Sequence, residues 1–142
     1  MSRQDSSRAS SAPPTQAALQ LKGWIRHRYE LVQESTQRKN KLTAICDELF
    51  PEFTQVLKYP HLPTALAIRE HFPTPQALAI APLAALIALR GKSRPTLAQL
   101  ERLQLVASQS IGVKDLVRQR GLTLEQGQLI RELHLLQEHI AQ

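Results

Sequence analysis

The chain is poor in aromatic residues and contains a single cysteine. Phe, Trp and Tyr make up 4% of its 142 residues, so a core must consist mainly of Leu, Ala and Ile. The lone Cys46 excludes a disulfide framework, and we expect a buried, unreactive thiol in a cytoplasmic protein. No apolar run approaches the roughly 18 residues that span a bilayer, because Pro82 interrupts the longest one. We therefore expect no membrane insertion.

Motifs of the common catalytic and cofactor sites are missing as well. There is no nucleophile elbow, Walker loop, GxGxxG or CxxC pair. The five histidines do not stand at metal-ligand spacing, since His134 and His139, five residues apart, project about 140° apart on a helix. We expect no catalytic residue, cofactor, metal or small-molecule substrate site in this chain.

Positive charge, by contrast, is plentiful. Eighteen Lys and Arg residues against twelve Asp and Glu give a formal charge of +6, with a pI near 10.0. A balance of this kind favours DNA, RNA or another anionic partner.

The N-terminal half predicts one long helix. Residues 1–15 are rich in Ser, Pro and charge, which is typical of a disordered tail, and Thr15 offers an N-cap. From Gln16 to Leu49 good helix formers dominate and Pro is absent. A helix of about 34 residues would be about 50 Å long, which is longer than the core of a small domain. This first arm, residues 16–50, is expected to protrude.

Residues 51–121 predict a cluster of short helices separated by Pro, Thr and Gly. The strongest start is Thr74-Pro75, with the Thr as cap and the Pro in the first turn. We expect helices at 63–71, 75–80, 82–90 and 96–111, with C-terminal stops at Gly91, Gly112 and Gly121.

The last segment, residues 122–142, predicts a second coiled-coil arm that is truncated. Its apolar residues follow a three-four spacing, with Gln126 in one gap: Leu122, Leu129, Leu133, Leu136 and Ile140. Thr123 and Gln126 fit a capping box, so the helix is expected to begin there. The predicted fold is all-α, a long-helix antiparallel coiled-coil hairpin with short helices at its tip.

In the long helix, the positions at the same three-four spacing are polar in the middle of the helix. They are Ile25, Arg28, Val32, Ser35, Lys39, Leu42, Cys46 and Leu49. Polar residues at such positions fix register, face solvent or meet a phosphate, and the spacing alone leaves these alternatives open. Other charges pair along one stripe, Arg26 with Glu30 and Glu34 with Arg38. The cations left over are the candidates for nucleic-acid contact: Arg28, Lys39 and Lys41.

Several stretches resemble a known family. The similarity covers most of the chain after Leu21, and its most specific pieces are RKNKL at 38–42, ELFPE at 48–52 and FPTP at 72–75. These pieces, within the runs 23–53, 72–92 and 125–142, resemble the central portion of DEDD-type insertion-sequence transposases of the IS-one-hundred-ten group.

The resemblance implies a role in DNA transposition and recombination. Members of the family join a RuvC-like nuclease domain, a helical coiled-coil middle and a domain with a catalytic serine, and this chain resembles the middle alone. A divalent metal is expected only for the missing nuclease domain, so we expect a truncated copy that is inactive by itself and associates with itself or with a partner helix. Two alternatives stay open, a free-standing helical adaptor and a small basic nucleic-acid-binding protein.

Overall fold

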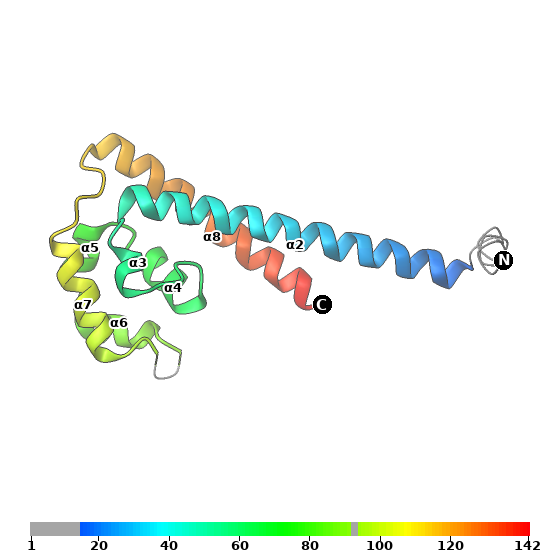
Figure 1. The fold of residues 1–142 in the computed structure, drawn as a ribbon, viewed down its shortest axis with the longest axis horizontal. Coiled ribbons are helices and arrows are strands. Elements are labelled where there is room, and N and C mark those ends of the chain that lie inside the picture. The colour runs from blue at the N-terminus through cyan, green and yellow to red at the C-terminus, as the bar shows by residue number, and fades with distance from the viewer. Residues whose placement is uncertain (1–14, 92–93) are drawn as a thin grey trace, which may run out of the picture.

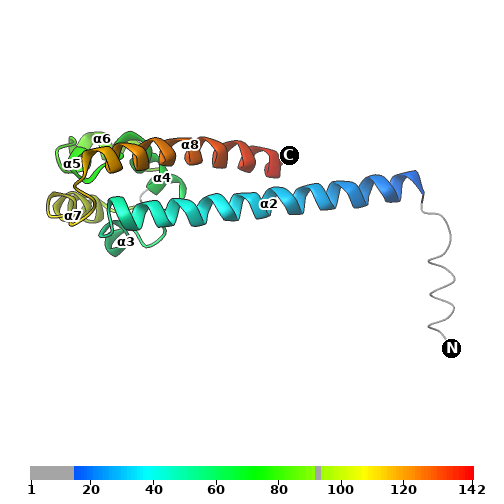
Figure 2. The same ribbon diagram turned by 90° about the horizontal axis from the view of Figure 1, so that it is seen from above.

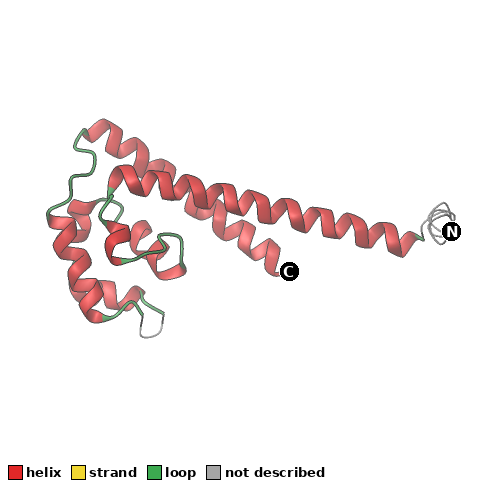
Figure 3. Cartoon of the chain, viewed as in Figure 1, coloured by secondary structure: helices red, strands yellow, loops and turns green. Residues whose placement is uncertain are grey.

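The computed structural model describes residues 15–91 and 94–142, and throughout these ranges the only regular secondary structure is helix (Figures 1 and 3). The all-α prediction is thereby confirmed. The expected tail, apart from Thr15, lies outside the described residues. The helices follow in the order α2 (Gln16–Leu49), α3 (Phe53–Val56), α4 (Pro63–His71), α5 (Pro75–Ala79), α6 (Leu83–Leu89), α7 (Leu97–Ser108) and α8 (Leu116–Ala141).

Helix α2 has the predicted bounds, and both ends have a local cause. The Thr15 hydroxyl accepts a hydrogen bond from the Ala18 N–H at 3.1 Å, which satisfies one of the free donors of the first turn. At the other end the Phe50 N–H still donates to the Cys46 carbonyl, but Pro51 follows and cannot donate in its turn.

Helices α2 and α8 form the predicted antiparallel hairpin, and their contact is the most extensive between any two elements. Figure 2 shows them side by side, with α8 ending partway along α2. The buried face of α2 lies in its C-terminal half, at Ser35, Leu42, Ile45, Cys46 and Leu49. The face of α8 turned to the interior carries Leu122, Gln126, Leu129, Ile130, Leu133 and Leu136.

The predicted start of the second arm at residue 122 is wrong, because α8 begins six residues earlier. The Asp115 carboxylate accepts hydrogen bonds from the N–H groups of Val117 and Arg118, at 2.9 and 3.4 Å, and so caps the helix. Gly121, predicted to stop a helix, lies inside α8. Thr123 caps nothing, since its hydroxyl is buried without a hydrogen-bond partner.

The short helices pack together at the closed end of the hairpin. Helix α7 contacts α3, α5 and α6, while α4 contacts α6 and α8. Their residues join the C-terminal half of α2 in one core, whose fully buried large side chains are Leu42, Leu49, Phe53, Leu66, Ile68, Leu78, Leu86, Leu100, Leu103, Ile130 and Leu133.

Within this cluster the prediction for α4 is confirmed, while the other helices are shorter than expected. Helices α5, α6 and α7 end at Ala79, Leu89 and Ser108, and the four-residue α3 was not predicted. A helix of one turn has too few residues to show a period, which is why the sequence did not indicate α3.

A loop at residues 110–113 closes over the end of α2. The Val113 N–H donates to the Glu48 carbonyl at 3.0 Å, so a carbonyl of the last turn gains a donor. Gly112 packs against the backbone of Leu49, where a Cβ atom would stand 2.0 Å from the carbonyl oxygen. Gly112 is therefore required by a close backbone approach, and the prediction that it ends a helix is wrong.

Glu52 also fixes the loop at residues 110–113. Its carboxylate accepts hydrogen bonds from the Ser110 hydroxyl at 2.6 Å and from the Ile111 N–H at 2.9 Å. Burial by itself would raise the pKa of Glu52, but these two donors stabilise the anion and bring the pKa below its ordinary value. The junction between the hairpin and the short helices thus depends on an ionised carboxylate.

Candidate functional site

The N-terminal part of α2 extends past the end of α8 and has no partner within the described residues. Every residue from Gln16 to Glu30 is exposed. The Arg28 guanidinium donates a hydrogen bond to the Ile140 carbonyl, which marks the level at which α8 ends. We call residues 16–28 of α2 the overhang, and Figure 2 shows it as the free end of the long helix.

Large apolar side chains are exposed on the overhang. Leu21, Trp24 and Ile25 are 58%, 54% and 54% exposed. The neighbouring Leu19 and Tyr29 are exposed to a similar degree. A helix this apolar on one side normally packs against another element. The overhang is therefore the main candidate interaction surface of this chain.

The three cations predicted to contact nucleic acid do not lie together. Arg28 is engaged with the end of α8, and Lys39, about 16 Å further along the helix, is half-buried close to His61. Lys41 is exposed and, two residues later, turned by about 200° from Lys39. The three cations are therefore separated by distance along α2 or by side of the helix, and their contact with DNA or RNA stays a prediction.

Arg38 pairs across the hairpin and not along the predicted stripe. Its Nε lies 3.3 Å from Glu132 Oε1 on α8, while an Nη1–H donates to the carbonyl of Glu34. A second ion pair, between Arg118 and Glu48 at 2.8 Å, joins the other end of the same two helices. The prediction of a Glu34–Arg38 side-chain pair is therefore wrong, because tertiary contact offers Arg38 a better acceptor.

The most unusual buried group is Arg69 of α4, which is 4% exposed. Its Nε and Nη2 donate to Gln126 Oε1 at 3.1 and 2.8 Å, Nη1 donates to the Pro60 carbonyl at 2.7 Å, and Nη2 donates to the Leu42 carbonyl at 2.6 Å. The Gln126 amide returns a hydrogen bond to the Arg69 carbonyl. Burial lowers the pKa of Arg69, yet arginine stays charged in proteins. One guanidinium thus ties α4 to both arms of the hairpin.

The sequence held a signal for Arg69 that the predictions did not use. In α4 it follows Ala65 by four residues and Leu66 by three, so it had to share their buried face. Gln126 was predicted as a gap in the apolar spacing of the second arm. Its amide oxygen instead supplies the acceptor that makes a buried cation tolerable.

The Cys46 thiol is also part of the interior and has no sign of reactivity. Burial raises its pKa to about 11, and Sγ donates a long hydrogen bond of 3.7 Å to the Phe50 carbonyl. A thiol of this kind is neutral at physiological pH and a poor nucleophile.

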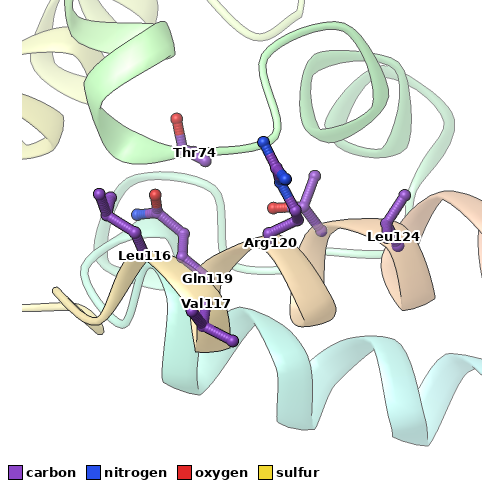
Figure 4. A pocket seen from close by; sticks show the side chains of 7 residues that line it. Thr74, Leu116, Val117, Gln119, Arg120 and Leu124 are labelled. Atoms are coloured by element: carbon purple, nitrogen blue, oxygen red, sulfur yellow. The ribbon is translucent and has the colours of Figure 1, made fainter.

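A hollow of about 710 Å³ lies between the first turns of α8 and the loop before α5 (Figure 4). Leu116, Val117 and Leu124 present apolar side chains there, and Gln119 and Arg120 are the polar groups beside them. Leu116 and Val117 are 76% and 83% exposed, so the hollow is shallow and open. Its donors do not converge on a point where a small substrate would be held.

The part of the chain that the structure describes shows no cluster of metal-ligating side chains and no helix that could span a membrane. Across residues 15–91 and 94–142, no three His, Cys, Asp or Glu side chains gather closely enough to hold an ion. None of the described helices is long and apolar enough to cross a bilayer.

Comparison of the chain with protein-family models, with curated proteins and with solved structures finds no match in any of the three. The similarity to insertion-sequence transposases therefore rests on the short residue motifs quoted above. The candidate site itself is the overhang of α2, a helix surface with exposed apolar side chains.

Proposed function

We propose that this chain is the coiled-coil assembly segment of a DNA-transposition protein of the IS-one-hundred-ten transposase group, and that it carries out no strand chemistry itself. The observation that carries the proposal is the overhang of α2, a helix continuing past its partner with Leu21, Trp24 and Ile25 exposed. A helix with an exposed apolar face of this kind packs against other helices. Subunit contact is also the role that the family resemblance implies for this region.

The positions of the family-like motifs support the same proposal. RKNKL, residues 38–42, includes Arg38, which pairs with α8, and Leu42, which is fully buried. ELFPE, residues 48–52, includes both carboxylates that anchor α8 and its preceding loop. FPTP, residues 72–75, provides the Thr74 cap of α5. Two of the three motifs thus coincide with contacts that maintain the hairpin, and the third caps a helix of the short-helix cluster.

The test with the clearest outcome is the DNA sequence on either side of the gene. We expect coding sequence for an acidic nuclease domain upstream and for a serine domain downstream, in the same or an adjacent reading frame. Unrelated genes on both sides would remove the transposase proposal and favour the free-standing adaptor. Incubation of the purified chain with DNA and Mg²⁺ is expected to give no strand cleavage.

The nucleic-acid alternative has its own readout, because phosphate contacts weaken steeply with salt. DNA and RNA are titrated with the chain at about 0.05 M and about 0.2 M salt. Binding that falls with salt and is lost in Lys41→Gln would support it, and no binding at the lower salt would end it. Leu19→Gln, an exposed apolar change on the same helix, is the control.

A further inference from the structure

The overhang continues the interface that α2 already forms with α8. Along α2 one set of positions alternates by four and three residues without a break: Ala17, Leu21, Trp24, Arg28, Leu31, Ser35, Arg38, Leu42, Ile45 and Leu49. The positions from Leu31 onward are buried or half-buried against the rest of the fold, whereas those from Ala17 to Arg28 are exposed. A seven-residue repeat of this kind keeps one face of a helix turned to a neighbour. The first three positions therefore lack the neighbour that α8 provides for the others, and the fourth, Arg28, meets only the last turn of α8 through the Ile140 carbonyl.

We propose that the missing neighbour is the overhang of a second copy of this chain, packed antiparallel in a two-fold symmetric dimer. The proposal deepens the assembly role given above and rests on it. In this arrangement Trp24 of one copy lies against Leu21 of the other, and the reverse, because two-fold symmetry repeats every contact. Ala17, the smallest member of the repeat, then faces the long Arg28.

The antiparallel direction follows from the place where α8 ends. A parallel second copy would have to continue along positions 31–49 of α2, where α8 already lies. An antiparallel copy leaves the overhang at its N-terminal end and overlaps none of the described helices of the first chain. The N-terminus of each α2 then points at the C-terminus of the other copy's α8, an alignment in which the helix dipoles attract.

The charges of the overhang give this dimer a distinctive dependence on salt. The overhang contains Lys22, Arg26 and Arg28 and no carboxylate, so two overhangs repel one another at low ionic strength. Screening reduces this repulsion. The dimer is therefore expected to tighten as salt increases, whereas binding of a nucleic acid would weaken.

Sedimentation equilibrium of the full chain tests the proposal. The expected mass is twice 16.0 kDa, with a dissociation constant that falls between about 0.05 and about 0.5 M NaCl. Leu21→Glu with Trp24→Glu is expected to raise that constant at least about 100-fold, since two central apolar contacts are lost. Leu19→Glu is the matched control, because Leu19 is equally exposed on the opposite side of the same helix and leaves the dimer intact.

A spin label at Lys41→Cys determines the direction. Lys41 is exposed, and Cys46 is too well buried to react. The antiparallel pairing places the two labels about 55 Å apart along the shared axis, whereas a parallel pair would bring them within about 20 Å.

A monomer at all salt concentrations, a short label distance, or dimerisation equally sensitive to Leu19→Glu would overturn the proposal. Circular dichroism of each variant verifies folding, because the overhang makes no core contact whose loss would unfold the chain. Failure here leaves the flanking-gene test of the transposase role unaffected, so the two proposals are distinguished.

Discussion

At the residue scale, Arg69 connects α4 to both arms of the hairpin. It is buried and charged, and it donates hydrogen bonds to acceptors from three separate segments, none of which is a carboxylate. Arg69→Ala is expected to cost about 3 kcal/mol of unfolding free energy, because the carbonyls of Leu42 and Pro60 lose their donor and a cavity remains. Urea denaturation measures the loss.

A double substitution tests whether unsatisfied hydrogen-bond partners cause this loss of stability. If the unsatisfied polar partner is responsible, Arg69→Met with Gln126→Leu will be more stable than Arg69→Met alone, since both ends of the polar contact are then apolar. Equal stability of the single and double variants would show that packing volume, and not hydrogen bonding, is what Arg69 contributes.

Gly112 is the second residue with a demanding position. A Cβ there would meet the Leu49 carbonyl at 2.0 Å, and a backbone atom cannot move aside as a side-chain end can. We expect Gly112→Ala to destabilise the chain by about 2 kcal/mol or more. Gly121→Ala, with open space around its Cβ inside α8, should stabilise by up to about 1 kcal/mol. Thermal unfolding of the two variants would show opposite shifts in Tm.

His61 gives the stability a dependence on pH. Burial, assisted by the charges of Lys39 and Arg69, lowers its pKa from the ordinary 6.5, so the folded chain favours the neutral ring. As pH falls below 6.5 the unfolded chain takes up a proton first, and stability decreases until the folded pKa is reached. Urea midpoints at pH about 7.5 and about 5.5 should differ less in His61→Asn than in the parent chain. An unchanged difference would exclude His61 as the source.

At the element scale, the sequence predicted the helices whose ends have local causes. Thr15, Pro63 and Thr74-Pro75 lie at the starts of α2, α4 and α5, as their capping chemistry requires. The start of α8 was missed because Gly121 was interpreted as a stop, and Asp115 follows a loop whose path depends on distant contacts with Glu48 and Glu52. Those contacts exist only in the folded chain and leave no local pattern.

The start of α8 can be tested by two matched substitutions. Asp115→Ala removes the observed cap and should cost about 1 kcal/mol, with faster hydrogen exchange in residues 116–120. Thr123→Ala removes a hydroxyl that has no partner, so it should be neutral or slightly stabilising. The reverse result would mean that α8 begins at Thr123, as the capping-box pattern had indicated.

At the scale of the whole molecule, the predicted hairpin is confirmed, but the candidate site differs from the one the sequence indicated. Spacing placed Arg28, Lys39 and Lys41 in one group because cations without a partner on their own helix were assumed to be free. In the fold Arg28 bonds to the end of α8 and Lys39 approaches the short helices. Partners that come from other elements are invisible to a helical pattern, whereas the exposed apolar overhang follows from where α8 ends.

The overhang itself provides the last prediction. The end of a helix that has no tertiary contacts frays readily in water, because each added helical residue is only marginally favourable. Residues 16–28 should therefore exchange their amide hydrogens quickly when the chain is dilute, and slowly once a second copy covers them. Residues 42–49 lie in the core and should be protected at every concentration. Hydrogen exchange at increasing protein concentration compares the two segments within one molecule, and in Leu21→Glu with Trp24→Glu the overhang should stay unprotected throughout. Protection of residues 16–28 that does not change with concentration would mean that the helix is stable alone, and the need for a second copy would disappear.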